Sequence, residues 1–299
     1  MSEQAERQGS RAEGPADSGH RFDAARRWPA SLELQFAPRG DRTRLVRSRH
    51  QGPLRVQRPF HPEGAPCHLY LLHPPGGLAS GDALDMRIHV AAGAEALVTT
   101  PAATKLYRSD ARGVAFEQHA RLAVESGGVL EWLPQETIAF DGARGTQTTH
   151  IELAAGAATL GWEVLALGRP AGAQPYRHGM LEQRFRLERG GRVLWHERQP
   201  LDPRHPRFAG RWGQGGATVQ ATLWAVGLDA PEASVAALRE TLVDEPPTCW
   251  AVTLRWEVLL LRYLGDDTRT AWRLCERAWQ LLRPRLSGRP ACAPRIWAT

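Results

Sequence analysis

The sequence predicts a mainly β body closed by a small C-terminal helical appendage, and three observations support this class. Between about residues 31 and 228, apolar and polar residues alternate in short runs broken by Gly and Pro, which is typical of strands joined by turns. Within this region a unit of about 30 residues recurs, which favours the stacked layers of a β-solenoid. Beyond Pro231 the pattern changes to that of helices. A β-sandwich with regular turns is the alternative for the body.

The run ALDMRIHV is the clearest strand. Leu84, Met86, Ile88 and Val90 alternate with polar residues, so one face can be buried while the other meets water. Four further runs share this pattern, at 114–124, 147–153, 181–188 and 192–198. The joints AAGA, SGG, AAGA and RGGR between such runs predict tight turns, and we expect no helix before residue 230.

The recurring unit has the same order of parts each time. It runs VAAGAEALVTTPAA from Val90, VESGGVLEWLPQE from Val124 and LAAGAATLGWEVLALGR from Leu153. Each copy has an apolar residue, a short spacer, a Gly and then another strand. A unit of this size cannot bury its apolar face alone, so stacking of successive units is expected.

Four regions follow from these changes of pattern. Residues 1–28 are polar without an apolar run, so we expect a disordered leader that is neither a signal peptide nor a membrane anchor. Residues 29–230 form the β body, 231–285 the C-terminal helices and 286–299 a flexible tail. The helices are expected in PEASVAALRETLV, TCWAVTLRWEVLLLRYL and DDTRTAWRLCERAWQLL. The stripe of Trp272, Cys275, Trp279 and Leu282 is most simply core against the β body, with a partner-binding surface as the alternative.

Composition excludes several classes of function. The formal charge is +6, but the arginines are spread along the chain among carboxylates and form no basic run with interleaved aromatics, which argues against nucleic-acid binding. No segment reaches the roughly 18 uninterrupted apolar residues of a membrane span, so we expect a soluble protein with no membrane partner. The four cysteines form no CxxC pair and are far apart, which predicts reduced thiols and a cytoplasmic location.

The usual catalytic signatures are absent. The sequence has no nucleophile elbow, P-loop, dinucleotide-binding glycine motif or HExxH helix. No two histidines pair at i, i+4 on a plausible helix. Cys67 and His68 are adjacent, so in a strand they point to opposite faces. We therefore predict no catalytic residue and no tight metal site.

The loop LHPPGGLASGDAL at residues 72–84 is rich in proline and glycine, which favour turns. Its two prolines and Gly76, Gly77 and Gly81 predict turns that place Asp82 at the start of a strand. The simplest role for Asp82 at this position is to stabilise the turn through backbone amides.

TTPAATKLYRSD at residues 99–110 contains the only lysine of the chain, Lys105, followed by Tyr107 and Arg108. A compact ammonium fits a narrow interior slot where a planar guanidinium does not. Lys105 is therefore predicted to reach a buried carboxylate. A lysine left on the surface by chance is the alternative of nearly equal weight.

Carboxylates recur in apolar company along the body. Glu136 and Asp141 lie in LEWLPQETIAFDGAR, Glu163 lies in GWEVLALGRPA with Arg169 after it, and Glu197 lies in LWHERQPL. Buried carboxylates cost several kcal/mol unless they are paired, so these groups either face water or find cations. One acid per repeat could line a common interior path, and loose carboxylate and water contacts suit an ion in transit such as Ni²⁺.

Four segments together resemble the family of the urease accessory protein UreD, called UreH in some species. They are HLYLLHPPGGLASGD, LVTTPAATKLYRS, LEWLPQETIAFDGA and EVLALGRPA. The resemblance covers about residues 30–230 in order and spacing and is looser in the helical end. One departure is Gln174, where the family pattern would have an acid, so a metal contact from that loop would be weakened.

The resemblance implies a non-enzymatic maturation factor with an antiparallel β-helical body and C-terminal helices. Its implied partners are apo-urease and UreF, which brings the GTPase UreG. The implied task is delivery of nickel to the urease active site through an internal polar tunnel, with Ni²⁺ bound only transiently and no tight cofactor. Asp82, Glu136, Asp141, Glu163 and Glu197 are the candidate tunnel residues, and Lys105, Tyr107, Arg108 and Arg169 are the candidate counter-charges and motif residues.

Two other functions stay open. One is a purely structural adaptor between urease and UreF that conducts no ion. The other is a solenoid enzyme acting on polysaccharide, which would need two carboxylates within about 10 Å on an open groove rimmed by exposed aromatics.

Overall fold

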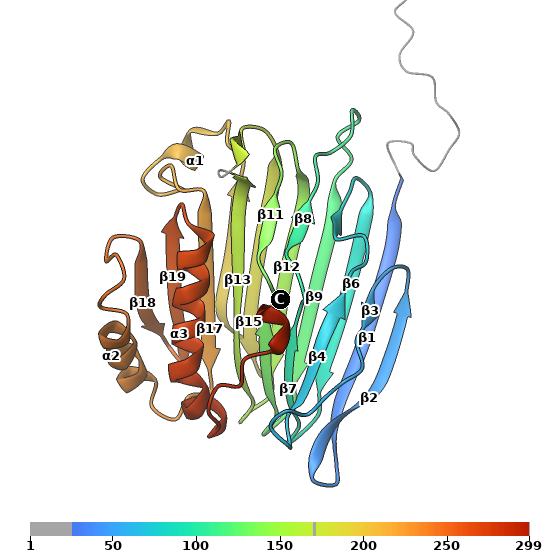
Figure 1. Cartoon of the computed structure of the whole chain (residues 1–299), viewed down its shortest axis with the longest axis vertical. Helices are drawn as coiled ribbons and strands as arrows, with labels where there is room; N and C mark the ends of the chain where they lie inside the picture. Colours follow the sequence, from blue (N-terminus) through green and yellow to red (C-terminus); the bar gives the residue numbers. More distant parts are fainter. Residues whose placement is uncertain (1–25, 170–171, 299) are drawn as a thin grey trace, which may run out of the picture.

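The structure is a computed structural model that describes residues 26–169 and 172–298. It contains a seven-stranded sheet and a twelve-stranded sheet that pack face to face, with a helical layer on the outer face of the larger sheet (Figure 1). The elements in chain order are β1 (Trp28–Arg39), β2 (Arg42–Gln51), β3 (Arg55–Val56), β4 (Cys67–Leu72), β5 (Gly77–Leu78), β6 (Asp82–Val90), β7 (Glu95–Thr99), β8 (Thr104–Leu106), β9 (Phe116–Val124), β10 (Val129–Leu133), β11 (Thr137–Ala139), β12 (Arg144–Leu153), β13 (Ala158–Arg169), β14 (Gln174–Pro175), β15 (Met180–Arg189), β16 (Arg192–Leu201), α1 (Pro206–Ala209), β17 (Val219–Val226), α2 (Pro231–Thr241), β18 (Trp250–Arg255), β19 (Val258–Gly265), α3 (Thr268–Ser287) and η2 (Arg295–Ala298).

Successive strands alternate between the two sheets. The chain passes from β6 to β7, from β9 to β10 and from β12 to β13, and in each case it crosses from the smaller sheet to the larger one. The repeat starts Val90, Val124 and Leu153 are the last residues of β6, β9 and β12. Their turns stack, because the amide of Glu125 donates to the Val90 carbonyl and the amide of Ala154 donates to the Val124 carbonyl, both at 2.9 Å. The predicted repeat is therefore present as stacked strand pairs.

The strand directions differ from one expectation. In the middle of both sheets the ladders are parallel, from β1 through β6, β9 and β12 to β15 and from β4 through β7 and β10 to β13. The expectation of an antiparallel body is therefore wrong for these ladders. Each strand is followed by a strand of the other sheet before the chain returns, so successive strands of one sheet run in the same direction. Antiparallel pairs occur at the margins. The mainly β class with a C-terminal helix is confirmed, and the full solenoid architecture stays a prediction.

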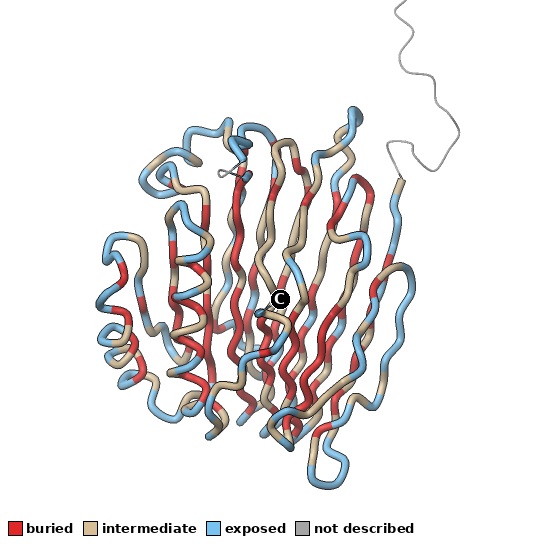
Figure 2. Tube along the Cα trace, in the orientation of Figure 1, coloured by how far each residue is buried: buried red, intermediate tan, exposed pale blue. Residues whose placement is uncertain are grey.

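The main core lies between the sheets. In β6, Leu84, Met86, Ile88 and Val90 are all buried, so the alternation expected for ALDMRIHV is confirmed. Buried residues concentrate toward one end of the strands, whereas the other half of the sheets is largely of intermediate exposure (Figure 2). The polar interior described below lies between the two sheets.

A second core lies between the twelve-stranded sheet and the helices. Trp272 of α3 packs against Trp162 of β13, and Trp297 of η2 contacts the rings of Trp162, Trp272 and Trp279 at centroid distances of 5.5–5.7 Å. Most of the predicted stripe is therefore core against the β body. Helix α3 extends to Ser287, and the flexibility of the tail after it stays a prediction.

Two helix expectations are wrong. The short helix α1 lies before residue 230, where no helix was expected, and one predicted helix consists of strands. TCWAVTLRWEVLLLRYL forms the antiparallel hairpin of β18 and β19, with Trp256 in its turn at a φ of 54°. Leu259 and Leu261 of β19 belong to the helix-side core, while Val258 and Leu260 belong to the core between the sheets. A strand buried on both faces reads as a continuous apolar run, and such a run resembles a buried helix.

Two expectations concern the ends of the chain and the membrane. The leader of residues 1–28 lies mostly outside the described residues, and β1 already begins at Trp28. Within residues 26–169 and 172–298, no helix combines the length and apolar composition that a bilayer crossing requires.

Candidate functional site

A ladder of four glutamines lies on the inner face of the seven-stranded sheet. Gln118 of β9, Gln147 of β12, Gln183 of β15 and Gln199 of β16 are register partners from strand to strand. The Gln147 amide donates to the Gln118 carbonyl oxygen at 3.0 Å. From the other sheet, Gln220 of β17 donates to the carbonyl oxygens of Gln183 at 2.7 Å and Gln199 at 2.6 Å. The interior is thus polar along one level of the sheets, and these amides connect the two layers.

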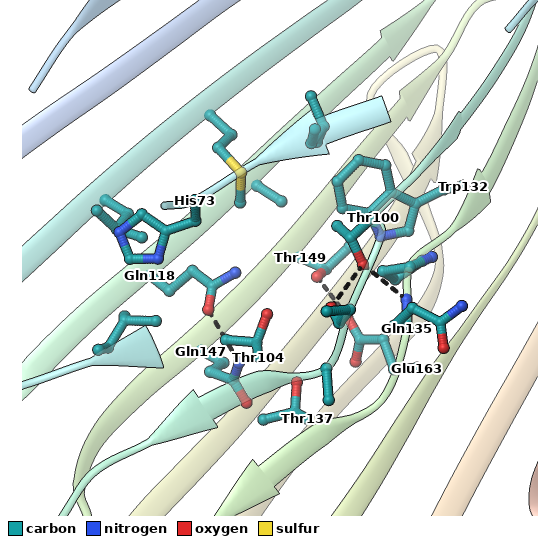
Figure 3. A pocket seen from close by; sticks show the side chains of 18 of the residues that line it. His73, Thr100, Thr104, Gln118, Trp132, Gln135, Thr137, Gln147, Thr149 and Glu163 are labelled. Carbon is teal, nitrogen blue, oxygen red and sulfur yellow. Dashed lines mark hydrogen bonds between the residues drawn. The ribbon is translucent and has the colours of Figure 1, made fainter. Parts of the chain in front are cut away.

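A cavity of about 130 Å³ lies beside this ladder, which is room for several water molecules. Gln118 and Gln147 line it from the seven-stranded sheet, and the loop TTPAAT and His73 line it from the other side (Figure 3). The buried side-chain oxygen Oε1 of Gln147 has no hydrogen-bond partner among the described residues. Unpaired buried acceptors are costly, so this space is suited to water or to a hydrated ion.

Glu163 of β13 projects into this polar interior from the twelve-stranded sheet. The hydroxyl of Thr149 donates to its carboxylate (Figure 3). Burial raises the pKa of Glu163 to about 7, and the charge of Glu197 adds to the rise. Glu163 and Gln183 also line a second cavity of about 30 Å³, so Glu163 lies between two cavities.

Glu197 of β16 lies at the far side of the second cavity. Arg262 of β19 donates to both carboxylate oxygens, with one contact at 3.0 Å, and the indole of Trp195 donates at 3.2 Å. Burial acts to raise the pKa of Glu197, but the hydrogen bonds and charge of Arg262 outweigh it and hold the pKa below its usual value. The structure therefore brings two of the five candidate carboxylates, Glu163 and Glu197, to one interior space.

The other three candidate carboxylates are elsewhere. Asp82 accepts from the amide of Ala79 at 2.7 Å, which is the turn-stabilising role. Glu136 accepts from the indole of Trp272 at 2.9 Å. Asp141 follows β11 and accepts from backbone amides of the loop before β15. None of the three lines either of the two cavities described above.

Lys105 does not meet a carboxylate. It lies in β8, and its side chain makes no ion pair or hydrogen bond with any residue of the described chain. The acids that it could have reached are taken, Glu136 by Trp272 and Asp141 by Arg108 at 3.0 Å. The predicted pairing of Lys105 with a buried carboxylate is therefore not formed.

The remaining motif residues form an aromatic corner. The rings of Tyr107 and Phe140 meet edge to face at 5.4 Å, and the Arg169 guanidinium lies 5.0 Å from the centre of the Phe140 ring. Arg169 also donates to the side-chain oxygen of Gln174 at 2.9 Å. The residue at the position where an acid was expected is thus an uncharged partner of Arg169.

The three glycines shape the loop as expected. Gly76 and Gly81 have φ angles of +73° and +87°, which glycine adopts without strain. A Cβ on Gly77 would lie 2.3 Å from the Lys105 carbonyl oxygen. Gly77 therefore allows β5 to approach β8 closely.

Replacing Asp141 with Asn should destabilise the protein by about 1–3 kcal/mol near neutral pH. Burial acts to raise the pKa of Asp141, but hydrogen bonds from the His178 ring and from the amides of Arg177 and His178 lower it to about 2. The stabilisation is present above the usual pKa of 3.8 and is lost as the pH falls through about 2. Urea denaturation at pH 7 measures it. Asp41→Asn, in the exposed turn after β1, should leave the free energy of unfolding nearly unchanged, and an equal loss in both variants would contradict the assignment.

The glutamine ladder was missing from the sequence prediction, although a signal for it exists. Gln118, Gln147 and Gln183 occupy the same inward phase in FEQHARL, GTQTTHI and LEQRFRL, between residues that face the core. A polar amide recurring at a core position in stacked strands predicts a ladder. Glutamine amides, together with threonine hydroxyls, supply most of the polar lining, and carboxylates supply little of it.

Among the described residues, one group of three could approach a metal ion. His150, Glu152 and Glu188 lie on the outer face of the seven-stranded sheet, and each offers one ligand atom within 4.8 Å of those of the other two. His150 is only partly covered and Glu152 is exposed, and the three are joined by ion pairs with each other. This arrangement is typical of a charged sheet surface.

Comparison with known proteins agrees with the resemblance. The family model of the UreD urease accessory protein matches residues 29–298. Proteins named urease accessory protein UreD are similar to this chain in Marinobacter nauticus, at 63% identity over 94% of this chain and 96% of the relative, and in Chromohalobacter salexigens, at 61% over 94% and 92%. One from Pseudoalteromonas translucida is 57% identical over 95% of each chain. The match spans both sheets and the helical layer, and the chain belongs to the UreD family of urease accessory proteins.

Proposed function

We propose that this chain is a non-enzymatic maturation factor of urease that passes Ni²⁺ through the polar interior between its sheets. In this proposal it works in the cytoplasm, binds apo-urease and UreF, and meets the GTPase UreG through UreF. The relatives at about 60% identity, which carry the name of urease accessory protein, support the urease part. The observation that carries the nickel part is Glu163, an acid that lines two cavities whose walls also carry glutamine side chains. The stacked strands act as a short solenoid that encloses this level.

The chemistry of the lining suits an ion that must leave again. Carboxylate and amide oxygens with water are weaker ligands for Ni²⁺ than the thiolates and imidazoles of a tight site. The described cavities contain one uncompensated acid, Glu163, because Glu197 is paired with Arg262. A passing cation favours the ionised form of Glu163, since an opposite charge nearby stabilises the carboxylate. Release of the cation returns the group toward neutrality.

The adaptor without ion conduction is the second candidate, and exposed aromatic residues favour it. Trp212 is 95% exposed in the loop after α1, and Trp256 is 63% exposed in the turn between β18 and β19. Exposed tryptophans are frequent energetic anchors of interfaces. An adaptor would use such anchors and would not need the polar interior.

The polysaccharide enzyme finds less support. Its two carboxylates would stand on an open groove with exposed aromatics on the rim. Glu163 and Glu197 instead face a cavity of about 30 Å³ between two sheets, which admits water but no sugar ring.

Replacing Glu163 with Gln tests the proposal. Gln keeps the shape and the hydrogen bond with Thr149 but cannot carry the charge that attracts a cation. We expect urease co-expressed with this variant, UreF and UreG to contain less nickel and to be activated about tenfold more slowly, which corresponds to about 1.4 kcal/mol of lost attraction. Nickel content, urease activity and co-purification of the complex are measured together.

Glu240→Gln is the matched control, because Glu240 is exposed on α2 and makes no ion pair with the described residues. It should behave as the unchanged protein. Normal nickel content with Glu163→Gln would leave the adaptor as the function. Loss of the complex in that variant would move Glu163 to a structural role.

A further inference from the structure

Arg262 stands where the polar interior meets solvent. It is a register partner of Thr222, which in turn is a register partner of Glu163, so the three residues form one inward rung across β13, β17 and β19. Glu197, the ion-pair partner of Arg262, comes from β16 at the edge of the opposite sheet. The Arg262 side chain is 37% exposed and that of Glu197 is 19% exposed. The pair thus joins the two sheets at the partly exposed end of the rung, and its Glu197 also lines the smaller cavity.

The contacts of the guanidinium are all with groups at this boundary. Arg262 donates to both oxygens of Glu197 and lies 5.4 Å from the centre of the Trp195 ring. Gln199 and the Trp195 indole donate to the same carboxylate. Glu197 therefore keeps hydrogen-bond donors when Arg262 moves away, whereas Arg262 can turn into water on its long side chain.

Behind the pair the interior stays polar and open. The cavity of about 30 Å³ begins at Glu197 and Gln199 and reaches Glu163 through Gln220 and Thr222. Trp224 lines it, is fully buried, and its Nε1 has no hydrogen-bond partner among the described residues. A buried donor without a partner calls for water in this space. A pair that only joined two sheets would need no hydrated space behind it.

We propose that Arg262 is a removable plug that excludes cations from the interior until it leaves Glu197. This deepens the proposed function and rests on it for the identity of the ion. In the closed state the guanidinium fills the opening and repels a divalent cation. In the open state Glu197 and Glu163 face the same small cavity as two free carboxylates. The incoming cation then replaces the Arg262 guanidinium at Glu197, so entry of the ion and opening of the cavity occur together.

A cysteine reporter at Thr222 tests the plug without any urease. Thr222→Cys is introduced into the full chain, alone and together with Arg262→Ala or Arg262→Lys. The rate of its modification by a small cationic thiosulfonate reagent is then measured by peptide mass. We expect Arg262→Ala to raise this rate at least about tenfold, because access to the thiol no longer requires the Arg262 side chain to move away from Glu197. Arg262→Lys should stay close to the unchanged protein, and a neutral reagent of similar size should show a smaller rise.

The native Cys275 reports unfolding, because it is buried in the helix-side core and unrelated to the opening. Faster modification of the introduced thiol with Cys275 still protected supports the plug. An unchanged rate at Thr222→Cys in the Arg262→Ala protein, or equal modification of Cys275, would show that the pair only holds the sheets together and would overturn the proposal. If Glu163→Gln leaves urease nickel unchanged, the nickel function falls, but the reporter still decides whether Arg262 closes the cavity.

Discussion

Replacing Arg283 with Ala is expected to destabilise the protein by about 3–5 kcal/mol. Arg283 of α3 is 1% exposed and donates through Nε to both oxygens of Glu131 on β10, at 2.9 and 3.0 Å. Its terminal nitrogens donate to Glu63 at 2.6 and 2.7 Å. Without the guanidinium, Glu131 would remain buried with only the Trp279 indole as donor, and Glu63 would keep only the His68 ring at 2.6 Å. The cost of these poorly compensated buried carboxylates dominates over the lost attraction. The charge cluster thus fixes α3 on the twelve-stranded sheet.

Urea denaturation followed by tryptophan fluorescence measures the loss. Arg289→Ala is the control, because the Arg289–Glu95 pair at 3.1 Å is partly exposed and should contribute less than about 1 kcal/mol. Arg283→Lys retains the charge but not the forked geometry, so its loss of stability should lie between those of Arg283→Ala and Arg289→Ala. It replaces the alanine variant in the measurement if Arg283→Ala fails to fold. Equal losses of stability for Arg283→Ala and Arg289→Ala would contradict this prediction, because the buried ion pairs would then contribute no more than the partly exposed one.

The strands were predictable because their residues alternate, and the same alternation explains which acids reach the interior. Glu163 and Glu197 lie within strands, where a period of two fixes the face to which a side chain points. Asp82 begins a strand, and Glu136 and Asp141 lie in the connections on either side of β11. In connections the local hydrogen bonds decide the direction of a side chain, and no periodicity reports them.

Contacts between distant segments could not be predicted from the sequence. Arg262 and Glu197 are 65 residues apart and belong to opposite sheets, so their pairing depends on how the two layers meet. The hairpin of β18 and β19 resembles a helix in sequence because both of its faces are covered, and the helix-side cover is α3 itself. Tertiary burial removed the alternation that identifies a strand.

Glu163 should make the protein less stable as the pH rises from about 4.5 to about 7. Burial raises its pKa from the usual 4.5 to about 7, so the folded chain holds a proton that the unfolded chain has released. The free energy of unfolding therefore falls as the pH rises from about 4.5 to about 7. Above about pH 7 the native state carries the full cost of the buried Glu163 charge. Each unit of pKa corresponds to about 1.4 kcal/mol, which sets the cost at pH 8 to at most about 3 kcal/mol.

Glu163→Gln removes this group, so its stability relative to the unchanged protein should be similar at pH 4.5 and higher by up to about 3 kcal/mol at pH 8. Urea denaturation across this pH range measures the difference, and the difference for Glu240→Gln should be flat. No gain at pH 8 would mean that cavity water solvates the carboxylate as well as bulk water does. A gain in stability together with poorer nickel loading would separate the two effects of this acid, because a site that attracts a cation must hold a charge that the fold alone would be better without.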